Sequence, residues 1–161
     1  MALSAPEGLR LVGEYGGAEQ WIADLVTLRR DGQPSVCVVN AGVLPHPIDG
    51  SATLAFVARA GTAKLANLRR DPRATLLFRS GWEWVAVRGT AQLAGPDDPL
   101  TGIGPDRLRR LLRDTYQAAG GHHPDMSEYD RVMAVERRVA VLVHPSRLTT
   151  NPVGAEHQEH G

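Results

Sequence analysis

The chain has 161 residues, 42% hydrophobic and 22% charged, with a formal net charge of zero when histidine is counted as neutral, which is typical of a single globular domain. The zero net charge argues against nucleic-acid binding through a basic field, and the single cysteine, Cys37, excludes an internal disulfide framework. The first ten residues lack the apolar core of a signal peptide and no apolar run approaches roughly 18 residues, so we expect a cytoplasmic protein without a membrane partner.

The first half of the chain predicts a short helix, a hairpin and a further strand. Trp21, Ile22 and Leu25 recur at helical spacing and predict a helix over about 18–24. The β-prone runs LVTLRR and PSVCVV flank Asp31-Gly32, a pair typical of hairpin turns because both turn positions need positive φ. The Pro- and Gly-rich stretch NAGVLPHPIDGSA predicts a loop over 40–52, and TLAFVAR after it predicts a strand.

The second half predicts strands separated by helices. A short helix over 60–72 ends at Asp71-Pro72, because proline disfavours helical geometry in the residue before it. ATLLF and EWVAVRGTAQLAG predict strands, RLRRLLRDTYQAAGG and HHPDMSEYDRVMAVERR predict helices, and VAVLVHP predicts a last strand that Pro145 ends. About six mostly antiparallel strands and four helices indicate an α+β fold, with one domain over 18–150 and flexible termini at 1–17 and 151–161.

The start of the 60–72 helix is the best candidate site. Its first-turn amides and the helix dipole attract anions, and no acidic residue occurs from Gly50 to Arg70. Thr62 lies at the cap and Lys64, the one lysine beside 17 arginines, follows two residues later. Asn67 shares the flank of Lys64, which places Arg70 on the opposite, solvated side. The alternative is that Thr62 simply caps the helix and Lys64 is solvated.

Other motifs give weaker signals. Neither a Walker loop, nor GxGxxG, nor GxSxG occurs. The neighbours His122 and His123 point apart, His46 has no partner close in sequence, and HQEH lies in the tail, so we expect no metal site. Trp82 follows a glycine in a turn, where we expect it to be exposed beside a pocket or a partner subunit.

Several blocks together resemble a known superfamily. They are TLRRDGQPSVCVV, LAFVARAGTAKLANLRRDPRATLLF, WVAVRGTAQL and RRVAVLVHPSRL, in that order and within about residues 18–148. The chain resembles the pyridoxamine 5′-phosphate oxidase-like superfamily, and within it the oxidoreductases that use the deazaflavin coenzyme F420. The resemblance implies a split β-barrel, mostly antiparallel with short peripheral helices. It also implies a homodimer with its cofactor sites at the interface and a small-molecule substrate.

The same resemblance implies where a cofactor is held. The start of the short helix, with Lys64, would bind the cofactor phosphate. By the same resemblance, Ala58 and Arg59 would lie along the flavin ring, and Val39 and Asn40 would contact its polar edge. Thr62, Ala63 and Asn67 of the helix motif would also bind the cofactor, and Trp82 would come from the neighbouring subunit. No residue is assigned as catalytic, because the cofactor carries the chemistry.

Two departures from the superfamily narrow the function. Thr62-Ala63-Lys64 replaces the Ser-Arg-Lys of pyridoxamine phosphate oxidases, and their C-terminal Trp and Arg have no match, which argues against vitamin B6 oxidation. We therefore expect an oxidoreductase that transfers hydride between F420 and a small organic substrate. The alternatives are an FMN-dependent oxidase or reductase, and a non-catalytic dimer that binds a cofactor or tetrapyrrole.

Overall fold

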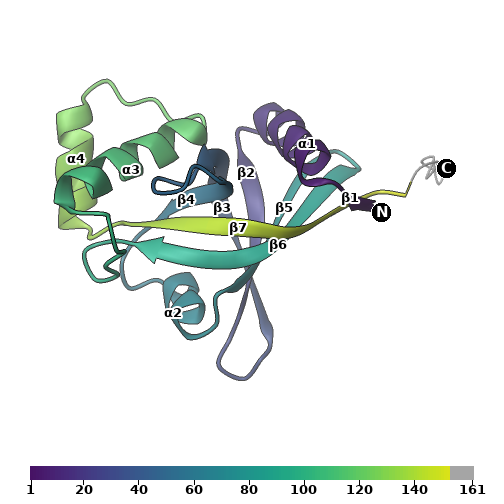
Figure 1. Cartoon of the computed structure of the whole chain (residues 1–161), viewed down its shortest axis with the longest axis horizontal. Helices are drawn as coiled ribbons and strands as arrows, with labels where there is room; N and C mark the ends of the chain where they lie inside the picture. The colour runs from purple at the N-terminus through teal and green to yellow at the C-terminus, as the bar shows by residue number, and fades with distance from the viewer. Residues whose placement is uncertain (153–161) are drawn as a thin grey trace.

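The computed structural model describes residues 1–152 and shows a β-barrel with peripheral helices (Figure 1). In chain order the elements are β1 (Ala2–Leu3), α1 (Ala5–Ala18), β2 (Ile22–Leu28), β3 (Pro34–Pro45), β4 (Ala52–Ala58), α2 (Ala63–Arg70), β5 (Arg73–Ser80), β6 (Glu83–Ala94), α3 (Pro105–Ala118), α4 (Met126–Val135) and β7 (Val139–Thr150).

The six long strands close on themselves. Their order is β7-β4-β3-β2-β5-β6, all pairs are antiparallel, and β6 pairs back onto β7. The short β1 adds to the outside of β7. Side chains that alternate along the strands fill the interior, among them the fully buried Leu25, Phe56 and Phe78. The α+β split-barrel class is thereby confirmed.

The hairpin at Asp31-Gly32 is confirmed, with a different turn. Of this pair only Gly32 has a positive φ, at 83°. The Gly32 N–H donates to the Arg29 carbonyl at 2.9 Å, and the Arg29 N–H donates to the Gln33 carbonyl at 2.9 Å. This is a three-residue loop with glycine in the left-handed position, which needs one positive φ where a two-residue turn needs two.

The N-terminal segment is folded, so the expected flexible stretch over 1–17 and helix over 18–24 are both wrong. Ser4 and Glu7 form a capping box that starts α1. Val12 of this helix is fully buried in the barrel core. The helix lies so close to β7 that a Cβ at Gly8 would be 2.3 Å from Leu148. The region of the expected helix over 18–24 instead contains the end of α1 at Ala18, a turn over 19–21 and the first residues of β2, a strand in which alternate residues are buried.

Two expected breaks in strands differ from the structure. The loop expected over 40–52 is confirmed only over 46–51, because β3 continues to Pro45 and β4 begins at Ala52. Gly42 lies within β3, where α3 approaches it closely. Strand β7 likewise passes through Pro145. This proline pairs with Gly89, next to a register shift at which Ser146 of β7 has no partner in β6, a place where a strand tolerates a residue without an N–H.

The C-terminal segment was expected to be flexible from residue 151. Asn151 instead contacts the barrel, since its side-chain N–H donates to the Trp82 carbonyl at 3.2 Å. Residues 153–161, which include the HQEH motif, lie outside the described part of the chain. In residues 1–152, every helix is too short or too polar to span a membrane.

Candidate functional site

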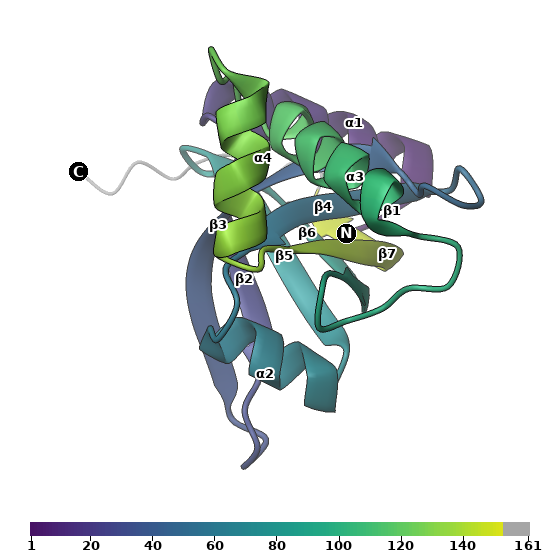
Figure 2. The same cartoon turned by 90° about the vertical axis from the view of Figure 1, so that its left-hand side faces the viewer.

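A cavity of about 390 Å³ lies where the end of β4 and the start of α2 meet β3, α3 and α4. In Figure 2, α2 lies in the lower part of the view beside the β2–β3 hairpin, and α3 and α4 lie together in the upper part. The cavity is lined by Val38, Val39, Asn40, Val57, Ala58, Arg59, Thr62, Lys64, Thr115, Tyr116, Ala119, Tyr129, Met133 and Arg138.

The cavity brings together most of the residues expected at a cofactor site. The members found in its lining are Val39, Asn40, Ala58, Arg59, Thr62 and Lys64. They come from the middle of β3, the end of β4 and the start of α2. Strands β3 and β4 are paired in the barrel, and α2 follows β4 in the chain. Ala63 is exposed next to this lining, whereas Asn67 and Trp82 lie away from it.

The cavity wall is cationic. Arg59, Lys64 and Arg138 line it, and its lining includes no acidic side chain. Arg138 is already paired with Glu136 at 2.6 Å. Among residues 1–152, Arg59 and Lys64 have no ion-pair partner within 4.0 Å. The site therefore offers two uncompensated cations in one half-enclosed space, which favours an anionic ligand.

The start of α2 adds backbone donors to these cations. Thr62 stands at the N-cap, but its hydroxyl donates to the Arg59 carbonyl at 3.0 Å and caps no amide. The first turn of this helix also contains no acidic residue. First-turn amides have no partner within a helix, and Thr62 and Lys64 at this helix start line the cavity, so donors for an anion are available next to it. These donors suit a phosphate group.

The chain is similar to a known protein family and to several solved structures. A family model for pyridoxamine 5′-phosphate oxidase matches residues 18–147, most of the chain. The chain belongs to the pyridoxamine 5′-phosphate oxidase family. Residues 1–17, with most of α1, lie before the matched region.

Solved structures share the fold at low sequence identity. A conserved hypothetical protein from Mycobacterium tuberculosis, Rv2991, is 23% identical with a TM-score of 0.66, over 99% of this chain and 92% of that one. An FMN-binding protein related to pyridoxamine 5′-phosphate oxidase, from Nostoc punctiforme, is 16% identical with a TM-score of 0.62, over 93% and 86%. An F420 reductase is 18% identical with a TM-score of 0.54, over 81% and 90%.

Asn67 lies elsewhere than its expected position beside Lys64. It is 7% exposed, and its side-chain N–H donates to the Thr27 hydroxyl at 3.1 Å. Its carbonyl oxygen accepts from Arg70 at 2.9 Å, and Arg70 also donates to the Leu28 carbonyl. The end of β2 covers this flank of α2, so Asn67 and Arg70 tie the helix to the barrel. Arg70 is thus no isolated surface cation.

The part of the cavity wall that α3 and α4 form was not predicted from the sequence. Helices α3 and α4 contribute Tyr116 and Tyr129, whose ring centroids are 4.8 Å apart. The Tyr129 hydroxyl donates to the Leu112 carbonyl at 3.0 Å, which holds the ring against α3. One feature of the sequence could have indicated this wall: two of the three tyrosines in the chain occur on these consecutive helices.

We expect Tyr129 to titrate apart from an ordinary tyrosine. Its burial, with a contribution from Tyr116, raises the pKa of its phenol from 10.0 to about 12. The folded state favours the neutral phenol, so this contribution to stability is complete below pH 10 and is lost as the pH rises from 10 to 12. Alkaline titration of tyrosinate absorbance should show a late step. Because burial also raises the pKa of Tyr15, the step belongs to Tyr129 only if Tyr129→Phe removes it.

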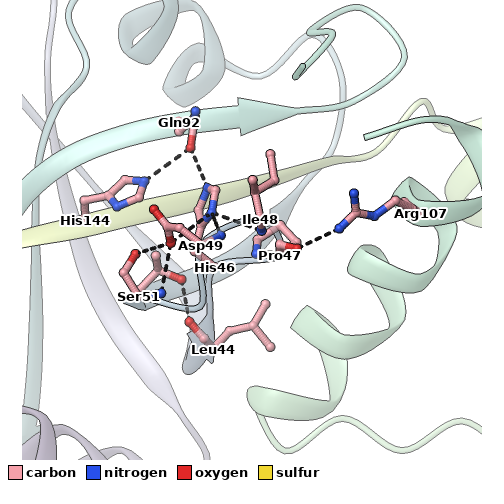
Figure 3. Close-up of polar contacts among 10 residues, drawn as sticks. Leu44, His46, Pro47, Ile48, Asp49, Ser51, Gln92, Arg107 and His144 are labelled. Atoms are coloured by element: carbon pink, nitrogen blue, oxygen red, sulfur yellow. Dashed lines mark hydrogen bonds and ion pairs between the residues drawn. The ribbon is translucent and has the colours of Figure 1, made fainter. Parts of the chain in front are cut away.

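His46 has partners that are distant in sequence (Figure 3). Its Nε2 lies 2.8 Å from the side-chain oxygen of Gln92, and the Nε2 of His144 lies 3.2 Å from the same oxygen. Because an amide oxygen only accepts, both Nε2 atoms are donors here. Arg107 of α3 also donates to the Pro47 carbonyl, so this turn is tied both to the barrel and to α3.

These contacts give the histidines a structural role. His46 is 6% exposed and anchors the β3–β4 turn, whose backbone makes its own N–H bonds to the ring. The described residues contain no group of three or more His, Cys, Asp or Glu side chains that could hold a metal ion.

Proposed function

We propose that this protein is an oxidoreductase that holds a phosphate-bearing, flavin-type cofactor, F420 in preference to FMN, and exchanges hydride with a small organic substrate. The observation that carries the proposal is that Lys64 lines a cavity at the start of α2, a helix whose first turn has no side-chain cap. Lys64 and the first-turn amides are donors for a phosphate group, and neither has an acidic partner among residues 1–152. The relatives named above include an FMN-binding protein and an F420 reductase.

Each part of the lining has a role in holding the cofactor. Lys64 and the first-turn amides of α2 would bind the phosphate, and Arg59 would meet a second negative group. Backbone groups of Val39 and Asn40 would face the polar edge of the ring, as expected from the family. The cofactor, when bound, supplies the hydride chemistry, while the protein orients it and excludes water. A surplus of cations beyond those needed for one phosphate supports F420, whose ring and tail are both acidic.

Titration with the two cofactors tests this proposal. Purified protein is titrated calorimetrically with F420 and, separately, with FMN. We expect saturable binding of one cofactor per chain, with F420 bound more tightly. Tighter binding of FMN would assign the alternative flavin function, and binding of neither would reject the cofactor site.

We also propose that two chains form a homodimer around strand β3. The outward face of this strand exposes Val36 and Val38 by 64% and 61%, and Ile22 on β2 is 47% exposed. Val38 also lines the cavity, so a partner seated on this face would close the cofactor site. Trp82, 80% exposed, would reach the partner's site as the family resemblance implies.

Val36→Asp should turn the dimer into a monomer. A carboxylate in the centre of an apolar interface would lose its hydration without gaining a partner, at a cost of about 2–5 kcal/mol. Sedimentation of the wild type and the variant measures the change. Ile48→Asp, at an exposed residue of the β3–β4 turn, is the matched control and should remain dimeric. A wild type that sediments as a monomer would contradict the proposed dimer.

A further inference from the structure

A second cavity, of about 410 Å³, adjoins the cofactor cavity, because Met133 and Arg138 line both. It is formed by the loop between β6 and α3, by residues of α3 and by the end of α4. None of the positions expected to bind the cofactor lines it. Its volume is within the range of ~300–1,000 Å³ that is typical of small-molecule sites. The second cavity is therefore a separate space of the size of a ligand.

The wall of the second cavity is mostly aliphatic. Its apolar members come from the loop, from α3 and from α4, and include Pro96, Pro99, Ile103, Leu108, Leu112 and Met133. Among the residues that the structure describes, no aromatic side chain belongs to this lining, whereas two tyrosines line the cofactor cavity. The wall therefore suits a flexible hydrocarbon chain, and it offers no ring face on which a flat ligand would stack.

Two of the charged side chains in this lining are already paired within the protein. The Arg113 Nε donates to the Asp130 carboxylate at 2.8 Å, and both side chains are largely covered. Arg138 is bound to Glu136 at 2.6 Å, and these two side chains are also less than one third exposed. The charges of Asp130 and Arg138 are thus compensated before any ligand binds.

Arg109 is the remaining charged side chain of the lining. Among residues 1–152 its ion-pair partner is Asp106, at 3.1 Å, and the two side chains are 56% and 83% exposed. So exposed a pair contributes little to stability, and a ligand carboxylate can take the place of Asp106. Gly104, the N-cap of α3, also lines the cavity and provides no side-chain cap for the first-turn amides. Arg109 therefore offers a cation beside the start of a helix, where an anion is favoured.

We propose that the second cavity binds an aliphatic carboxylate, with its hydrocarbon chain against Leu108, Leu112 and Met133 and its carboxylate on Arg109. A guanidinium forms two parallel hydrogen bonds to a carboxylate, which fixes the direction of the chain. The proposal does not depend on the proposed function, because these side chains are not the ones that would hold the cofactor phosphate. A ligand bound here would lie against Met133 and Arg138, and so against the wall of the cofactor cavity.

Filling the second cavity tests where the hydrocarbon chain binds. Ala134→Trp places a large ring in the lining at an exposed position of α4. Val135→Trp is the matched control, since Val135 is the next residue, is 72% exposed and lines neither cavity. The affinity for octanoate is measured by calorimetry on the whole chain without cofactor. We expect saturable binding by the wild type, about tenfold weaker binding by Ala134→Trp and unchanged binding by Val135→Trp.

A second pair of variants tests the contact with the carboxylate. Arg109→Gln removes the cation, and Arg110→Gln removes the same charge from the next residue of α3, which is exposed and lines neither cavity. Each variant is titrated with octanoate and with 1-octanol, which has the same chain without a charge. We expect Arg109→Gln to weaken octanoate binding by about tenfold and to leave 1-octanol binding unchanged. Arg110→Gln should leave both affinities unchanged.

Three results would overturn the proposal. The first is no octanoate binding by the wild type, or equal affinity in the wild type, Ala134→Trp and Arg109→Gln. The second is loss of octanoate binding in Lys64→Ala, which would place the ligand in the cofactor cavity. The third is a change in the sedimentation of Ala134→Trp without octanoate binding by the wild type, which would assign the second cavity to a contact between copies of the chain.

Discussion

Lys64→Ala is expected to weaken F420 binding by about tenfold to a hundredfold. The loss corresponds to one charge-assisted contact to phosphate, about 1.5–3 kcal/mol. Lys64 lines the cavity and has no ion-pair partner among residues 1–152, so its removal leaves no buried group unpaired. The free energy of unfolding should therefore stay near that of the wild type. Calorimetric titration and thermal unfolding measure the two quantities.

A second variant distinguishes a direct contact between Lys64 and the cofactor from a general effect of the protein's charge on affinity. Arg69→Ala removes the same charge from the other end of α2, where Arg69 is paired with Asp98 outside the cavity. We expect its F420 affinity to stay within about twofold of the wild type. An equal loss in both variants would indicate a general electrostatic effect, and unchanged affinity in Lys64→Ala would reject the phosphate assignment.

Asn67 shows where spacing along a helix misleads. Residues three apart share a flank of an isolated helix, which placed Asn67 beside Lys64. In the folded chain the end of β2 covers that flank, and Asn67 binds Thr27 there. Which side chains of a helix are buried depends on the strand that packs against it. Asn67 and Thr27 are 40 positions apart, so no pattern of neighbouring residues predicts their contact.

The parts of the site that could be predicted are those set by neighbouring residues. The bounds of α2 follow from Thr62 and from Pro72, and the cationic character follows from Arg59 and Lys64 in one acid-free window. These features depend on backbone chemistry that acts within a few residues. The family motif adds the β3 and β4 positions, which lie in adjacent paired strands.

The missed parts depend on distant packing. Glycine has a low helix propensity, and α1 contains four glycines, so its pattern did not predict a helix. Two of them, Gly8 and Gly16, are buried where the helix touches the barrel and Trp21. The tyrosine wall of the cavity likewise depends on how α3 and α4 fold back over β3 and β4. Gly8 and Gly16, which weaken the local helix signal, are thus places of close contact in the folded chain.

Gly42→Ala should have one of the largest effects of any single methyl added to this barrel. A Cβ at Gly42 would lie 2.1 Å from the Ala118 carbonyl oxygen and 2.3 Å from its carbonyl carbon. Both are backbone atoms of α3, so no side-chain rotation relieves the clash, and α3 must move away from β3. We expect the free energy of unfolding to fall by about 1–3 kcal/mol, as in overpacked cores.

The same displacement should weaken F420 binding, because Thr115, Tyr116 and Ala119 of α3 line the cavity. Denaturant unfolding and F420 titration of Gly42→Ala measure the two effects together. Gly13→Ala is the matched control: a Cβ there meets nothing within 4 Å, and alanine favours the helix by up to about 1 kcal/mol. Loss of stability with unchanged F420 affinity would show that the tyrosine wall does not contact the cofactor. Loss of both would show that the packing of α3 on β3 sets the width of the site.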